Sequence, residues 1–125
     1  MNVQRFSTFA IFIFLVGCTT GRLEYLTKEG DKRTACETEY TWAPSVDKYA
    51  VEYILSYCAK KAVENGFTVI DKRLLSLNTT TPQPPVGKSW SHPFAEELYD
   101  NNLLTDKEYG YLIAYLDLEH DNSNE

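Results

Sequence analysis

Apolar residues recur at helical spacing in the middle of the chain. Between Ser45 and Gly66, apolar and aromatic side chains fall at the i, i+3 and i+4 positions of one helix face. These residues are Val46, Tyr49, Ala50, Tyr53, Ile54, Tyr57, Cys58 and Ala62. Ser45 is expected to cap the amino end, and Asn65-Gly66 to stop the helix in a left-handed conformation. The pattern therefore predicts one long helix over residues 45–66.

The C-terminal part of the chain predicts two shorter helices. The first begins at His92-Pro93, because proline suits the first helical turn, and ends at Asn101-Asn102. The second begins with Thr105-Asp106-Lys107-Glu108, a capping box in which the threonine and the glutamate each bind the other's backbone amide. Its apolar stripe consists of Tyr109, Leu112, Ile113 and Leu116. We therefore expect a helical hairpin that ends near Leu118.

This stretch, from Ala95 to Leu118, resembles the short C-terminal helical hairpin of the SHOCT type that is appended to many bacterial proteins. The similarity lies in Leu98 and in the run from Leu103 to Tyr109, which holds two leucines, the capping box and an aromatic residue. The turn that usually carries a glycine holds Asn101-Asn102 here. The resemblance covers about a fifth of the chain and implies no catalytic residues.

The other segments show weaker patterns. The run Phe67 to Ile70 predicts one short strand or extended segment. Prolines impose an extended strap on residues 78–85. Residues 18–35 are polar and lack a sustained period, so we predict a tether. The expected fold is mainly α, with one long helix, a C-terminal helical hairpin and a short extended segment, in a single globular domain over residues 36–125.

The amino end has the pattern of a secretory signal. Arg5 is followed by a nearly all-apolar run from Phe6 to Val16, which is shorter than the roughly 20 residues of a membrane span. The run ends in Leu15-Val16-Gly17-Cys18, which resembles the lipobox of bacterial lipoproteins. The resemblance implies that residues 1–17 are a signal peptide. The alternatives are an ordinary cleaved signal with a free Cys18, or an N-terminal anchor helix.

The same resemblance implies a lipid anchor. The Cys18 thiol would receive a diacylglyceryl group, and the new amine would be acylated, for example with palmitate. Two or three acyl chains hold a protein on a membrane far more firmly than one chain does. Residue 19 is threonine, not the aspartate that retains such proteins in the inner membrane of enteric bacteria. By analogy we expect the outer membrane, with the domain facing the periplasm.

The anchor leaves an even number of cysteines. With Cys18 acylated, Cys36 and Cys58 remain, and in an oxidising compartment they are expected to form a structural disulfide. Closing this loop would stabilise the domain by roughly 3 kcal/mol. A metal site is the alternative, but the sequence has no Cys-x-x-Cys pair and no histidine at ligand spacing nearby. We therefore expect neither a metal nor a cofactor.

Charge divides the chain and excludes some partners. The 125 residues carry a formal charge of −6, which argues against binding nucleic acid through its phosphates. In residues 92–125 Lys107 stands alone against nine carboxylates. Histidine is rare: His92 lies four residues before Glu96, but no second histidine completes a zinc site. We therefore expect no catalysis, although an envelope enzyme that uses His92 with Glu96 or a neighbour stays open.

Aromatic residues are the remaining signal of function. Tyrosine and tryptophan are numerous for a small core, and they dominate protein-binding surfaces. The candidates for partner binding are Trp90, Tyr109, Tyr111 and Tyr115; the alternative is that tyrosines simply line the edge of the core. We expect a non-catalytic binding or structural module held on the membrane by its lipid. The second hypothesis is an immunity or inhibitor protein against a periplasmic toxin or cell-wall hydrolase.

Overall fold

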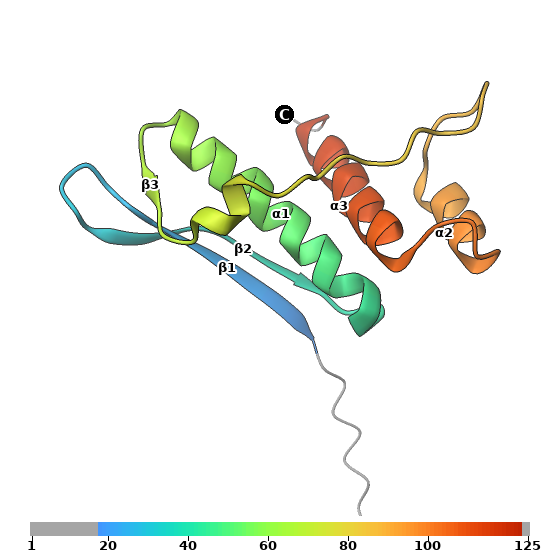
Figure 1. Cartoon of the computed structure of the whole chain (residues 1–125), viewed down its shortest axis with the longest axis horizontal. Coiled ribbons are helices and arrows are strands. Elements are labelled where there is room, and N and C mark those ends of the chain that lie inside the picture. The colour runs from blue at the N-terminus through green and yellow to red at the C-terminus, as the bar shows by residue number, and fades with distance from the viewer. Residues whose placement is uncertain (1–17, 124–125) are drawn as a thin grey trace, which may run out of the picture.

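The described domain begins with two strands, and a third, short strand follows the first helix. The computed structural model describes residues 18–123, so the predicted signal peptide over residues 1–17 lies outside the described residues. In chain order the elements are β1 (Thr19–Leu26), β2 (Lys32–Tyr40), α1 (Pro44–Glu64), β3 (Thr68–Val69), the 3₁₀ helix η1 (Lys72–Leu75), α2 (His92–Asp100) and α3 (Asp106–Asn122). Helix α1 lies across the sheet, and α3 and α2 follow beside it (Figure 1).

The sheet has three antiparallel strands in the order β2-β1-β3. A tight turn joins β1 to β2, and Gly30 adopts a φ of 87° there, a conformation that L side chains rarely adopt. Side chains alternate along β1: Leu23 is buried, whereas Arg22 is exposed and pairs with Glu37 of β2 across 2.7 Å. One face of the sheet therefore packs on α1, and the other carries exposed charged side chains.

The expected mainly α fold is wrong. Residues 19–35, predicted as a tether, form β1 and the first part of β2. The physical reason is that the helices cover one face of the hairpin only, so every second residue is polar and no apolar run marks the strands. The described domain is therefore α+β: a helix and a helical pair packed beside an antiparallel sheet.

Helix α1 packs on the sheet through small and apolar side chains. Gly21 of β1 lets the helix approach closely, because a Cβ atom there would meet Val51 and Leu55. The predicted disulfide between Cys36 and Cys58 is confirmed, with its Cα atoms 6.4 Å apart, and it joins β2 to α1. The buried residues of this part of the core are Leu23, Ala59, Ala62, Val69 and Leu74.

Helix α3 packs on α1, and α2 packs on α3. Gly110 of α3 lies against the α1 backbone, where a Cβ atom would stand 2.7 Å from the Val46 carbonyl oxygen. The second group of buried core residues is Val46, Ala95, Leu104, Tyr109, Leu112 and Leu116. The capping box between Thr105 and Glu108 is confirmed. The N-cap of α1 is Ala43 and not Ser45, because Pro44 already occupies the first turn.

Candidate anchor and partner-binding sites

Cys18 lies at one end of the sheet, directly before β1. Its side chain is exposed and it is the free cysteine, since Cys36 and Cys58 are bonded to each other. The next residue, Thr19, already pairs with Tyr40 of β2. The Glu39 carboxylate raises the pKa of the Cys18 thiol, first by accepting its hydrogen bond and then by repelling the thiolate. The thiol is therefore accessible on a fixed piece of backbone.

His92 lies beside Asp117 and not beside Glu96. Its Nε2 atom is 2.7 Å from Oδ1 of Asp117, and both side chains are about half exposed. The second oxygen of Asp117 accepts a 2.7 Å hydrogen bond from the hydroxyl of Tyr40. Burial raises the pKa of Tyr40, and Asp117 raises it further. This His-Asp-Tyr group joins three elements, and no hydroxyl or thiol in residues 18–123 is hydrogen-bonded to His92 as a nucleophile would be.

The four aromatic residues predicted to bind a partner do not form one surface. Tyr109 and Tyr111 are only 5% and 2% exposed, and the Tyr111 hydroxyl donates to Glu52 across 2.8 Å. Tyr115 donates to Glu119 on its own helix. Trp90 is half-buried and its Nε1 atom donates to the Pro82 carbonyl oxygen. These side chains have structural contacts, so little of Tyr109 or Tyr111 is available to a partner.

A different aromatic cluster reaches the surface. The ring of Tyr99 stacks on that of Tyr109 with centroids 4.4 Å apart, and Trp42 contacts both rings edge-on. Trp42 is 53% exposed. The sequence pattern missed this cluster because Trp42 belongs to no periodic run. The position of Trp42, directly before the Ala43-Pro44 pair that starts a helix, was the feature of the sequence that could have indicated this cluster.

Residues 82–90 form a protruding loop, which we call the Val86 loop. The hydrogen bond from Trp90 to Pro82 closes its base at 2.8 Å. The amide of Lys88 donates to Pro85, and Gly87 turns the chain with a φ of 78°. The Lys88 ammonium stands 5.0 Å from the centre of the Phe94 ring. Val86 at the tip is fully exposed, with a relative exposure of 104%. The loop therefore presents an apolar tip on a braced base.

An acidic groove runs between the end of β2 and the end of α3. Its volume is about 430 Å³, and its lining includes Glu37, Glu39, Asp117 and Asp121. Asp47 of α1 contributes a further buried carboxylate to the surroundings of Tyr40. Residues 18–123 hold no group of three or more metal-binding side chains placed to share an ion. The groove therefore has the charge to take up a cationic side chain from a partner.

No protein-family model, no curated protein and no solved structure matches this chain. The resemblances to bacterial lipoproteins and to SHOCT-type hairpins therefore depend on the residues quoted above. Within residues 18–123 no helix is both long enough and apolar enough to cross a bilayer.

Proposed function

We propose that this protein is a lipoprotein of the bacterial cell envelope, anchored through Cys18 and acting as a non-catalytic binding module. The observation that carries the proposal is that two of the three cysteines are bonded to each other and the third is free. Cys36 and Cys58 bond to each other, and Cys18 stays free and exposed at the start of the domain. A lipid-modified cysteine must be accessible and unpaired, and Cys18 meets both conditions after a lipobox-like sequence.

The disulfide supports the compartment. Such bonds persist in oxidising environments, of which the bacterial periplasm is one. Thr19 at the second position of the mature chain supports the outer membrane over the inner membrane, by analogy with enteric lipoproteins. The domain would then face the periplasm.

The anchor is tested by the mass of the mature protein. The full-length chain is produced in an enteric host with palmitate labelling, and we expect a mature chain that begins at Cys18 with added acyl mass. Cys18→Ser should abolish both the label and the processing. Thr19→Asp is the matched variant for location, and it should keep the label but move the protein to inner-membrane fractions. A mature chain that begins elsewhere, or at Cys18 without acyl mass, would contradict the proposal.

The Val86 loop is the candidate partner-binding element. In Figure 1 it projects at the opposite side of the domain from the start of β1, so an anchored domain would hold its tip away from the membrane. A fully exposed valine on a braced loop loses little conformational freedom on binding, and that favours affinity. The partner would be a protein with an apolar pocket for Val86 and an acceptor near Lys88.

Photo-crosslinking tests this element in living cells. A photoreactive residue at position 86 should yield a discrete crosslinked species, whereas one at the exposed position 70 should not. Val86→Asp should weaken capture of the same species at least about tenfold, since a buried unpaired carboxylate opposes binding. Equal crosslinking from both positions would argue against the loop.

An inhibitor role is the second candidate, and the acidic groove favours it. Its lining is acidic and would complement a basic toxin or wall hydrolase, with Glu37 already paired with Arg22 and Asp117 in contact with His92. The crosslinked partner decides this point: a basic enzyme that loses activity at one equivalent of the domain supports inhibition. Loss of an intrinsic activity on His92→Ala would instead support the enzyme alternative.

A further inference from the structure

The end of the domain that carries Cys18 also presents an exposed aromatic side chain, that of Trp42. We infer that this end rests on the bilayer and that the Trp42 indole lies at the level of the lipid headgroups, beside the acyl chains on Cys18. The inference rests on the proposed lipid anchor. It goes beyond that anchor because it assigns the face of the domain that meets the membrane.

The link between anchor and domain is one peptide bond long. Thr19 is fixed in β1 by its pairing with Tyr40, and consecutive Cα atoms are about 3.8 Å apart. The headgroup region on each side of a bilayer core is only about 5–7 Å thick. Acyl chains on Cys18 would therefore hold this end of the domain close to the headgroups.

Trp42 lies near the same end of the domain. It follows Tyr40, the partner of Thr19, by two residues, so the Cα atoms of Cys18 and Trp42 are at most about 16 Å apart. Another exposed apolar residue, Ile70, lies much farther away. It follows β3, which pairs with Tyr25 and Leu26 at the far end of β1, roughly 20 Å along the strand from Thr19. Of these two exposed apolar side chains, Trp42 is therefore the one nearer to the anchor.

The Trp42 ring is held in place. Its centroid lies 5.7 Å from that of Tyr99 and 5.4 Å from that of Tyr109, with the rings nearly perpendicular. Tyr109 is buried, so one side of the indole rests on the core and the other meets water. Tryptophan is enriched at membrane–water interfaces because its ring is apolar and its N–H is polar.

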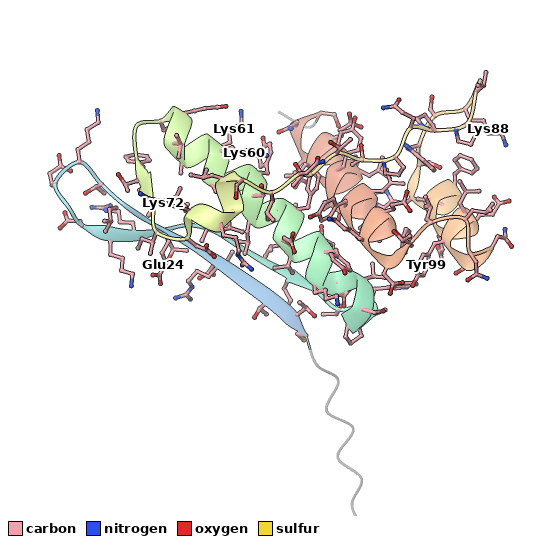
Figure 2. The ribbon with its side chains drawn as sticks, viewed as in Figure 1. Glu24, Lys60, Lys61, Lys72, Lys88 and Tyr99 are labelled. Atoms are coloured by element: carbon pink, nitrogen blue, oxygen red, sulfur yellow. A yellow bond between two sulfur atoms is a disulfide. The ribbon has the colours of Figure 1, made fainter. Side chains whose placement is uncertain are left out.

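Charge does not set this orientation. The groups at this end are of both signs: Glu39 faces the Cys18 thiol and Asp106 accepts a hydrogen bond from Tyr99, whereas Lys48 lies in the first turns of α1 and Lys107 directly follows Asp106. Lys60 and Lys61 lie toward the opposite end of the domain from the start of β1 (Figure 2). Attraction to anionic lipid would pull that other end down. Apolar contact at Trp42 therefore predicts an orientation that persists on zwitterionic membranes.

Tryptophan fluorescence measures this contact directly. The chain has two tryptophans, so Trp90→Phe leaves Trp42 as the only one, and the matched Trp42→Phe leaves Trp90 on the remote loop. Each mature protein is isolated from membranes and placed in phosphatidylcholine vesicles with spin labels near the headgroup or deep in the chains. We expect the shallow label to quench Trp42 at least about twofold more than the deep label, and Trp90 to be quenched by neither.

The mass spectrum of the same sample distinguishes a failure of the lipid anchor from a failure of the bilayer contact at Trp42. If the chain is acylated and Trp42 is quenched no more than Trp90, the bilayer contact is wrong and the anchor stands. A chain without acyl mass overturns the anchor and the contact together. Quenching or an emission shift of Trp42 by soluble glycan strands, without an effect of vesicles, would also overturn the contact.

The contact can still be tested if the Trp90→Phe variant does not fold. Trp90 donates a hydrogen bond within the Val86 loop, so Trp90→Phe is checked by circular dichroism and by the oxidised state of Cys36 and Cys58. Should it fail this check, the wild-type protein is compared with Trp42→Phe. The quenching by the shallow label should then disappear on removal of Trp42, and its persistence would contradict the inference.

Discussion

Tyr40 at the end of β2 donates a hydrogen bond of 2.7 Å to Asp117 near the end of α3. The other oxygen of Asp117 is 2.7 Å from Nε2 of His92 at the start of α2. One carboxylate thus links the sheet to both C-terminal helices. Tyr40 also pairs with Thr19, the residue directly after Cys18, so this contact lies close to the proposed anchor.

Tyr40→Phe should destabilise the domain by about 1–2 kcal/mol, because a hydrogen bond to a charged acceptor is lost and the ring is retained. The matched control is Tyr115→Phe, whose hydroxyl bonds the exposed Glu119 on the same helix and should matter by less than about 0.5 kcal/mol. Urea unfolding of both variants measures the difference. Equal effects would show that the Tyr40–Asp117 contact does not hold the layers together.

The stability of the domain should fall in alkaline solution. Burial raises the pKa of Tyr40 and Tyr111, and hydrogen bonds to Asp117 and Glu52 raise the two pKa values further. The stability that the two protonated hydroxyls contribute to the folded domain is fully present below the tyrosine pKa of the unfolded chain, which is about 10. It is lost above that pH, because the unfolded chain then releases protons that the folded chain retains.

Urea unfolding at pH 9 and at pH 11 tests whether stability falls as the pH rises. The free energy of unfolding should be lower at pH 11, and the decrease should be smaller in a Tyr40→Phe/Tyr111→Phe double variant. An alkaline decrease of the same size in the double variant would assign it to other groups.

The disulfide should contribute about 3 kcal/mol to stability through the unfolded chain, given its sequence separation of 22 residues. A Cys36→Ala/Cys58→Ala variant should unfold at correspondingly lower urea concentration, and dithiothreitol should lower the stability of the wild type but not of the variant. Cys18→Ser is the control, and it should leave unfolding unchanged because the Cys18 side chain is exposed. A loss of stability in that control would show that Cys18 has a structural role.

Gly110→Ala should separate α1 from α3. The new Cβ would stand 2.7 Å from the Cβ of Tyr49 and 2.7 Å from the Val46 carbonyl oxygen, and the backbone atom cannot rotate away. Overpacking of this kind costs typically 1–3 kcal/mol, which exceeds the gain of up to about 1 kcal/mol in helix propensity. Gly30→Ala, in open space at positive φ, should cost about 1 kcal/mol from backbone strain alone. Chemical unfolding measures both, and a stabilised Gly110→Ala protein would contradict the close packing.

The helices were predictable because local signals mark most of their ends; the exception is the amino end of α1, where Ala43 and not Ser45 is the N-cap. Thr105 and Glu108 form the capping box that their spacing predicts, and Gly66 adopts a φ of 83° where the sequence places the stop of α1. The 3.6-residue period of the apolar positions predicted that the residues between these ends are helical. The disulfide followed from the number of cysteines once Cys18 was set aside.

The sheet was not predicted, because its signal is weak for a physical reason. In β2, Cys36 and Tyr40 are partly buried and alternate with the exposed Glu37 and Glu39, a period of two that is present in the sequence. Since the outer face of the hairpin meets water, the apolar content is half that of a covered strand. Glycine and charged residues then made the segment look like a linker.

The site residues show the same limit. His92 was matched with Glu96, four residues away on one helix, but its partner is Asp117, which comes from another helix. Trp42 and Tyr109 are separated by 67 positions and contact each other only through the fold. Sequence spacing identifies neighbours within one element, whereas these contacts depend on how the helices cross.

The position of β1 in the middle of the sheet also decides how the domain bears a mechanical load. A pull between a partner at the Val86 loop and the anchor would enter at Cys18, at the start of β1 (Figure 1), which is hydrogen-bonded to β2 over its whole length and to β3 at its far end. The Thr19–Tyr40 pair would take the load first, and the rest of the ladder after it. With β2 bonded covalently to α1 through Cys36 and Cys58, the strain would spread from the strand into the helical layer.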